Sequence, residues 1–147
     1  MKFEIKGFKT WSTMDGGGYQ FNLYVDGKKS FFVHNDGNGG CIDVHSYDTF
    51  TKPNAPSPSF DALMAHIKAM PQYEFMGEMY DHDIDTFMDG LVNEYEKEKL
   101  FKKYRKTNTL FRLLNDEKGT FRRLTTLDVN VAKDWLEKNH PNNYEFI

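Results

Sequence analysis

The chain has 147 residues, a formal net charge of −3 and an aromatic content of 16%. This length is typical of one domain, and the single cysteine, Cys41, excludes an internal disulfide. No apolar run approaches the ~18 residues of a transmembrane helix, and Met1-Lys2-Phe3-Glu4 alternates like a strand instead of resembling a signal sequence. We therefore expect a single-domain (1–147) cytoplasmic protein that does not insert into membranes.

The first 50 residues predict an antiparallel β-meander (1–50). Polar and apolar side chains alternate with the period of a half-buried strand in four segments, residues 2–6, 19–25, 30–34 and 41–45. Gly16-Gly17-Gly18 interrupts the pattern between the first two segments. Asp26-Gly27 is a strong signal for a two-residue hairpin turn, and the glycine-rich residues 36–40 predict a second reversal.

Residues 57–106 predict the helical part of the chain. Ser57 or Ser59 is a suitable N-cap, Pro58 suits the first helical position, and Pro71 ends the helix. Its apolar residues recur at helical spacing: Phe60, Leu63, Met64, Ile67 and Met70.

A longer helix is predicted to begin near Asp83, with an apolar stripe that runs from Ile84 to Tyr95. Its later apolar residues, Phe101 and Tyr104, lie around the helix axis from that stripe. Either the helix bends or breaks near residues 96–98, or its last turns bury a different face. We favour the second alternative.

Residues 108–147 predict a second β-hairpin, formed by residues 109–114 and 120–124, and a C-terminal helix over residues 128–139. Asp128 is the expected N-cap of this helix, and Pro141 follows it. The apolar face is expected to contain Val131, Ala132, Trp135 and Leu136. Strands followed by about three helices and a late hairpin predict an α+β fold with helices on one face of an antiparallel sheet.

Charge is unevenly distributed along the chain. Residues 69–96 contain eight acidic side chains and neither lysine nor arginine, whereas residues 97–125 contain ten basic residues and three acidic ones. Patches of opposite sign select binding partners. We expect an acidic face that contacts a protein partner, formed by Glu78, Asp81, Asp85, Asp89 and Glu96. The alternative is a solvated surface that keeps the protein soluble.

The basic residues suggest nucleic-acid binding as a second hypothesis. The predicted contacts alternate with Phe101 and Tyr104 and are Lys99, Lys102, Lys103, Arg105, Arg112, Arg122 and Arg123. Lysines at the end of a helix also complement its macrodipole, which is the structural alternative.

A small metal-dependent hydrolase is the third hypothesis. If residues 41–45 form a strand, alternate side chains share one face, and the N, S and O donors of five residues are candidate ligands: His34, Asp36, Cys41, Asp43 and His45. No CxxC or HxxxH spacing accompanies them, so we expect no bound cofactor. The glycines of residues 36–40 are expected to serve a tight reversal, and the acids of residues 80–85 to cap a helix.

Several short segments resemble a type of small accessory protein encoded by phages and mobile elements. They are Val25-Asp26-Gly27-Lys28, residues 36–40, Thr109-Leu110-Phe111-Arg112, residues 119–124 and residues 143–147. The resemblance implies no catalytic residue. It implies an accessory role, and with the charge pattern it favours a non-enzymatic protein that binds a host protein or complex, with inhibition of a bacterial defence system as one version. The oligomeric state is left open by the sequence.

Overall fold

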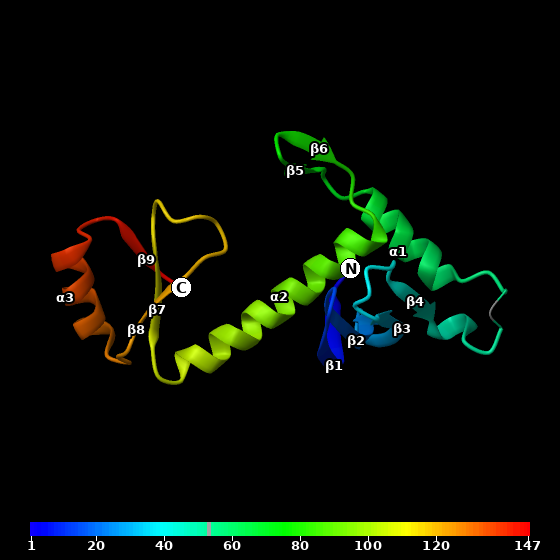
Figure 1. The fold of residues 1–147 in the computed structure, drawn as a ribbon, viewed down its shortest axis with the longest axis horizontal. Helices are drawn as coiled ribbons and strands as arrows, with labels where there is room; N and C mark the ends of the chain where they lie inside the picture. Colours follow the sequence, from blue (N-terminus) through cyan, green and yellow to red (C-terminus); the bar gives the residue numbers. More distant parts are fainter. Residues whose placement is uncertain (53) are drawn as a thin grey trace. The chain divides into compact units, whose positions relative to one another are not determined.

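The computed structural model describes residues 1–52 and 54–147 and has the predicted α+β architecture (Figure 1). The chain divides into two compact units, Met1–Asn93 and Glu94–Ile147. One helix, α2 (Ile84–Arg105), runs from the first unit into the second. The expectation of a single domain stays a prediction, and each unit is described by itself.

The first unit contains the predicted four-stranded antiparallel meander. Its strands follow one another in the order β1 (Phe3–Thr13), β2 (Gly16–Val25), β3 (Lys28–Asn35) and β4 (Asp43–Ser46). The turn between β2 and β3 is formed by Asp26 and Gly27, both at positive φ, as predicted for a type I′ turn. A short 3₁₀ helix, η1 (Tyr47–Thr49), follows the sheet.

The expectation that Gly16-Gly17-Gly18 interrupts the sheet is wrong. These glycines begin β2 and pair with the end of β1, which is longer than its alternating pattern indicated. For Gly18 the requirement for glycine comes from the ring of Trp11, which lies over it. A Cβ atom on Gly18 would lie 2.2 Å from Trp11 Nε1, so only glycine allows the ring to approach the strand.

Two helices cover one face of this sheet. The first, α1 (Pro58–Lys68), begins as predicted, because Ser57 Oγ accepts a hydrogen bond from the Phe60 N–H at 3.1 Å. The second is the N-terminal part of α2. Between them and the sheet lies the buried core, formed by Tyr19, Phe21, Leu23, Phe31, Val33, Leu63, Ile67, Phe87, Met88 and Val92.

A small hairpin that the sequence pattern does not predict joins the two helices. Its strands are β5 (Tyr73–Phe75) and β6 (Glu78–Tyr80), and among the described residues they pair only with each other. Within the first unit, Figure 1 shows this hairpin standing clear of the four-stranded sheet.

The second unit contains a three-stranded sheet in the order β8-β7-β9, formed by β7 (Thr109–Leu113), β8 (Arg122–Leu124) and β9 (Tyr144–Phe146). The predicted hairpin of β7 and β8 is confirmed, whereas β9 was not expected. The last turns of α2 contribute the buried Phe101, which meets Phe121 edge-on with ring centroids 4.9 Å apart. This confirms that the helix buries a different face near its end.

The C-terminal helix α3 (Val129–Asn139) is capped by Asp128 as predicted, since its carboxylate accepts hydrogen bonds from the backbone N–H groups of Asn130 and Val131. Its expected apolar face is only half right. Ala132 and Leu136 are buried, but Val131 and Trp135 are exposed. The small sheet of this unit covers a narrow stripe of the helix, so residues one position away from the buried pair face solvent.

Candidate interaction surfaces

The β5–β6 hairpin exposes four large apolar side chains. Phe75, Met76, Met79 and Tyr80 are between 40% and 87% exposed. Its two-residue turn consists of Met76 at φ 51° and Gly77 at φ 81°. A methionine rarely adopts positive φ, because its Cβ then crowds the backbone. The hairpin therefore keeps an unfavourable residue at its most exposed position.

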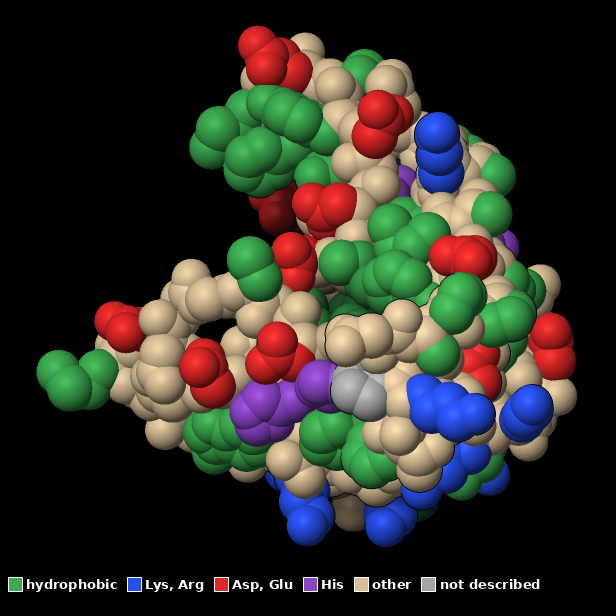
Figure 2. Space-filling model, turned by 90° about the vertical axis from the view of Figure 1, so that its right-hand side faces the viewer, with side chains coloured by type: hydrophobic (Ala, Val, Ile, Leu, Met, Phe, Trp, Pro, Cys, Tyr) green, Lys and Arg blue, Asp and Glu red, His purple; other side chains and the backbone are tan. Residues whose placement is uncertain are grey.

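Carboxylates surround these apolar side chains. Glu74 and Glu78 lie on the two strands and Asp81 follows β6 directly. Tyr80 Oη donates a hydrogen bond of 2.8 Å to Glu78, which raises the pKa of the Tyr80 phenol. The space-filling view shows the result, a hydrophobic cluster with acidic side chains around it (Figure 2). We call residues 73–81 the acidic hairpin.

Opposite charges do not neutralise the acidic hairpin. Among the described residues, the four ion pairs are Lys6–Glu4, Lys97–Glu94, Arg112–Glu145 and Arg122–Asp116. None of them includes a carboxylate of residues 69–93. The carboxylates of the acidic hairpin are therefore free of ion pairs among the described residues.

Two acids of the predicted face have a structural role instead. Asp85 accepts a hydrogen bond of 3.0 Å from the Ile42 N–H, and Asp89 accepts one of 2.7 Å from Tyr19 Oη. Burial raises the pKa of the Tyr19 phenol, and the hydrogen bond to Asp89 raises it further. Both carboxylates thus fasten α2 to the first unit's meander, while Glu96 belongs to the second unit.

The five acids of the predicted face thus belong to different elements. Glu78 and Asp81 lie on the acidic hairpin, and the other three predicted acids do not. Sequence reasoning also missed the apolar residues beside them. The available signal was the Gly77 turn between two short segments rich in tyrosine, phenylalanine and methionine.

The lysines of the second unit gather on one side of α2. Lys99, Lys102 and Lys103 are exposed, and a spacing of i, i+3, i+4 places them on one helix face. Phe101 and Tyr104 occupy another face of this helix, where both contact Phe121. We call the three lysines the lysine stripe.

The arginines predicted to bind nucleic acid are engaged within the second unit. Arg112 forms an ion pair with Glu145, and Arg122 binds Asp116 through two hydrogen bonds of 2.9 Å. The hydrogen bonds from Arg122 lower the pKa of the Asp116 carboxyl.

Two further basic residues lie over aromatic rings of the same unit. Arg123 lies 4.3 Å from the centroid of the Tyr104 ring, and Arg105 lies 5.3 Å from that of Phe101. Of the seven predicted residues, Arg112 and Arg122 are the two that form ion pairs among the described residues. Lys103 of the lysine stripe also lies near an aromatic ring, with its Nζ 5.7 Å from the centroid of Tyr104.

The five candidate metal ligands do not form a site. Among the described residues, no group of three or more histidine, cysteine, aspartate or glutamate side chains is arranged to hold a metal ion. The assumption that Cys41, Asp43 and His45 share one strand is wrong, because β4 begins at Asp43 and Cys41 precedes it. His34 instead stacks on Phe32 at a centroid distance of 6.3 Å.

Side-chain oxygens near these residues stabilise the predicted turn by accepting hydrogen bonds from the backbone. Asn35 Oδ1 accepts a hydrogen bond from the Gly37 N–H, and Asp36 Oδ1 accepts one from the Asn38 N–H, both at 2.9 Å. Asp83 caps α2 by accepting a hydrogen bond from the Thr86 N–H at 2.8 Å, which lowers the pKa of the Asp83 carboxyl.

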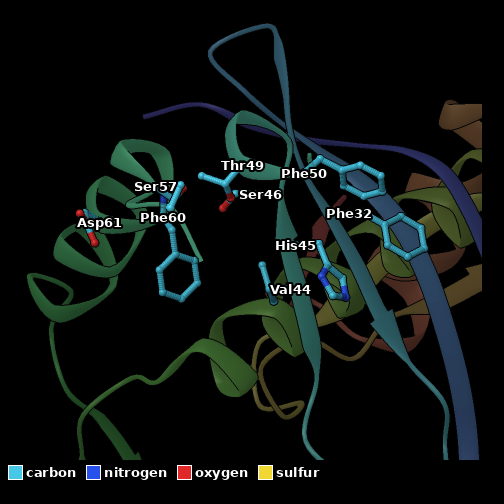
Figure 3. A pocket seen from close by; sticks show the side chains of 10 residues that line it. Phe32, Val44, His45, Ser46, Thr49, Phe50, Ser57, Phe60 and Asp61 are labelled. Carbon is cyan, nitrogen blue, oxygen red and sulfur yellow. Dashed lines mark hydrogen bonds between the residues drawn. The ribbon is translucent and has the colours of Figure 1, made fainter. Parts of the chain in front are cut away.

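A cavity of about 640 Å³ opens beside β4. Phe32, His45 and Phe50 form one of its sides, and Ser57 and Phe60 of the α1 region form the other (Figure 3). The Ser57 hydroxyl donates a hydrogen bond to Asp48 at 2.7 Å and accepts one from the Phe60 N–H, so it is not an activated nucleophile.

Comparisons with known proteins assign no family. No family model, no curated protein and no solved structure matches the chain. Within the described residues, no helix has both the length and the apolar composition required to cross a lipid bilayer.

Proposed function

We propose that this chain is a non-enzymatic binding protein that captures a host protein through the acidic hairpin. One observation carries the proposal: Phe75, Met76 and Met79 are exposed on a two-stranded hairpin that has carboxylates around it and no basic residue on it. Apolar side chains in such a position gain nothing for the fold. Protein interfaces use them as anchors inside a polar rim.

The charge of the hairpin defines the partner. Glu74, Glu78 and Asp81 favour a protein surface with an apolar pocket and lysine or arginine at its rim. Carboxylates at the rim speed association and make it sensitive to salt, while the buried anchors control dissociation. The resemblance to phage and mobile-element accessory proteins supports a bacterial host protein, and inhibition of a defence complex is the corresponding biological role.

The test combines capture from a host lysate with matched variants. Immobilised protein is expected to retain a specific partner, which mass spectrometry identifies and which is then purified for affinity measurement. The double variant Phe75→Ala, Met79→Ala is expected to weaken binding by 30-fold or more, about 2 kcal/mol, because it removes two anchors. The control is Val129→Ala, Val131→Ala, which shortens two apolar residues of α3 that are similarly exposed. Equal binding by both variants would exclude the acidic hairpin.

Charge reversal tests the rim separately. Glu78→Lys with Asp81→Lys is expected to slow association and to reduce its salt dependence, with a smaller effect on dissociation. The control reverses two exposed acids of the second unit, Glu117→Lys and Asp134→Lys. Unchanged association kinetics in the Glu78→Lys, Asp81→Lys variant would mean that these carboxylates do not contribute to association.

The lysine stripe favours duplex DNA binding as a second candidate function. Replacing Lys99, Lys102 and Lys103 by glutamine is expected to reduce the slope of log affinity against log salt by about 2 to 3, because each phosphate contact contributes about 0.9. The matched control replaces three exposed lysines elsewhere in the second unit, Lys118, Lys133 and Lys138. Absence of binding at low salt would remove this candidate.

A further inference from the structure

The four-stranded sheet has a second face that carries aromatic and imidazole rings. Side chains alternate along each strand, so the residues between the core positions point to the opposite side of the sheet. Phe31 and Val33 are buried beneath α1 and α2, whereas Phe32 and His34 lie on the other face. Register places His45 of β4 opposite Phe32 on this same face.

Trp11, His34 and Phe32 form a row across this face. The ring centroids of Trp11 and His34 are 5.6 Å apart, and those of His34 and Phe32 are 6.3 Å apart with the planes inclined by 18°. All three rings are half-buried and keep part of their surface accessible. Figure 2 shows histidine side chains next to hydrophobic ones on the viewed side of the molecule.

The backbone holds the first ring of the row in place. Trp11 Nε1 donates a hydrogen bond of 3.1 Å to the Asp36 carbonyl, and the ring lies over Gly18 where a side chain would clash. A fixed ring loses little conformational entropy when a ligand stacks on it. Gly18 is thereby explained, because it makes room for the Trp11 ring on the solvent side of the sheet.

Lysines lie next to the rings of this face. Lys6 Nζ is 4.4 Å from the Tyr24 ring centroid and also forms an ion pair with Glu4, and Lys29 Nζ is 4.6 Å from the Tyr47 ring centroid. The carboxylate of Asp43 shares this face through its register with His34. Lys9 shares the face through its register with Gln20. At the β4 end of the face, the cavity of about 640 Å³ adds the exposed Phe50 beside Phe32 and His45 (Figure 3).

We propose that this aromatic face binds single-stranded nucleic acid. Bases stack on Trp11, His34 and Phe32, and the phosphates between them contact the neighbouring lysines. Each base offers a π face, so a row of fixed rings suits a flexible strand with unpaired bases, whereas a duplex keeps its bases stacked inside. The site consists of residues of the first unit's meander, whereas the lysine stripe belongs to the second unit, and the proposal does not depend on the acidic hairpin.

The fluorescence of Trp11 provides a direct test, because the chain contains two tryptophans, Trp11 and Trp135. In the variant Trp135→Phe, only Trp11 emits, and titration with an oligothymidylate of about 12 nucleotides is expected to quench it as a base stacks on the ring. In the variant Trp11→Phe, only Trp135 emits, and its emission is expected to stay unchanged. Absence of quenching in the first variant would overturn the proposal.

Affinity measurements with a labelled oligothymidylate give a second, independent readout. Phe32→Leu keeps an apolar side chain but removes a stacking ring, and is expected to weaken binding about tenfold. Phe75→Leu, the same change on the acidic hairpin, is expected to bind like the wild type. Circular dichroism establishes that both variants are folded. Equal affinities of the two variants would overturn the proposal.

The salt dependence of binding, and a comparison of single-stranded with duplex DNA, distinguish this site from the lysine stripe. Three lysines predict a slope of log affinity against log salt no steeper than about −2 for a single strand. The variant with Lys99, Lys102 and Lys103 replaced by glutamine is expected to bind the oligothymidylate as tightly as the wild type does. Oligothymidylate binding that is lost with the stripe, or a duplex that binds the stripe variant as tightly as the single strand does, would overturn the proposal.

Discussion

Two hairpins of the first unit have the same turn geometry and different surroundings. Asp26-Gly27 joins β2 and β3 at φ 49° and 82°, and Met76-Gly77 joins β5 and β6 at φ 51° and 81°. Asp26 tolerates this conformation and also accepts a hydrogen bond of 2.8 Å from the Lys2 N–H. Met76 does neither, and is 87% exposed. Asp26 therefore suits the positive φ of its turn, whereas Met76 does not.

The strands on either side of the two turns differ in the same way. The β2–β3 hairpin buries Leu23, Phe31 and Val33 almost completely, whereas the β5–β6 hairpin leaves Phe75 and Met79 in solvent. Burial of apolar surface is worth about 25 cal/mol per Å², so the first hairpin supplies much of the unit's stability. The second supplies little. Its apolar composition is therefore better explained by binding than by folding.

Matched truncations test this difference most strongly. Leu23→Ala is expected to lower the free energy of unfolding by about 2–5 kcal/mol, because it leaves a cavity between the sheet and the helices. Met79→Ala removes an exposed side chain and is expected to stay within about 0.5 kcal/mol of the wild type. Urea denaturation followed by circular dichroism measures both. A loss of several kcal/mol in Met79→Ala would mean that the hairpin packs against the fold.

Turns and helix caps are the features that local sequence signals predict. Asp26-Gly27, the Ser57-Pro58 start of α1 and the Asp128 cap of α3 were all predicted, because each acts within a few residues of itself. The alternation of the meander was equally clear. These signals were sufficient for the α+β class and for most element positions in both units.

The unpredicted features depend on partners distant in sequence. The local sequence predicts an interruption at Gly18, because Trp11 becomes its neighbour only when β1 and β2 pair. Asp85 and Asp89 were assigned to a binding face, but their partners Ile42 and Tyr19 lie 43 and 70 residues away. The charge pattern correctly located an acidic region. Only the fold separates the carboxylates that hold α2 from those beside exposed apolar side chains.

Two tyrosines extend the comparison to hydrogen bonds. Tyr19 of β2 donates to Asp89 of α2, whereas Tyr80 of β6 donates to Glu78, two residues away. Tyr19→Phe is expected to lower the free energy of unfolding by about 1.5–3 kcal/mol at neutral pH, since a hydrogen bond to a charged acceptor is lost. Tyr80→Phe is expected to have no measurable effect on stability.

The same pair of variants predicts a pH dependence. The pKa of Tyr19 is raised in the folded state above its usual value of 10.0, so the folded protein holds this proton more tightly than the unfolded chain does. This contribution to stability is complete below pH ~10 and is lost as the pH rises beyond it. The wild type is therefore expected to lose stability more steeply above pH ~10 than Tyr19→Phe. Parallel curves for the two proteins would show that Tyr19 titrates as it does in the unfolded chain.

The smallest expected effect concerns the turns themselves. Asparagine tolerates positive φ better than methionine, so Met76→Asn is expected to raise the free energy of unfolding by about 0.5–1 kcal/mol. Asp26→Asn, a change between two residues that both suit this conformation, is the control and is expected to leave stability unchanged. If Met76 is an interface anchor, the stabilised variant will also bind its partner more weakly, because a protein can retain a locally unfavourable residue where function requires it. A variant that is more stable and binds equally well would place the anchor at Phe75 and Met79 and leave the methionine at the turn without a functional explanation.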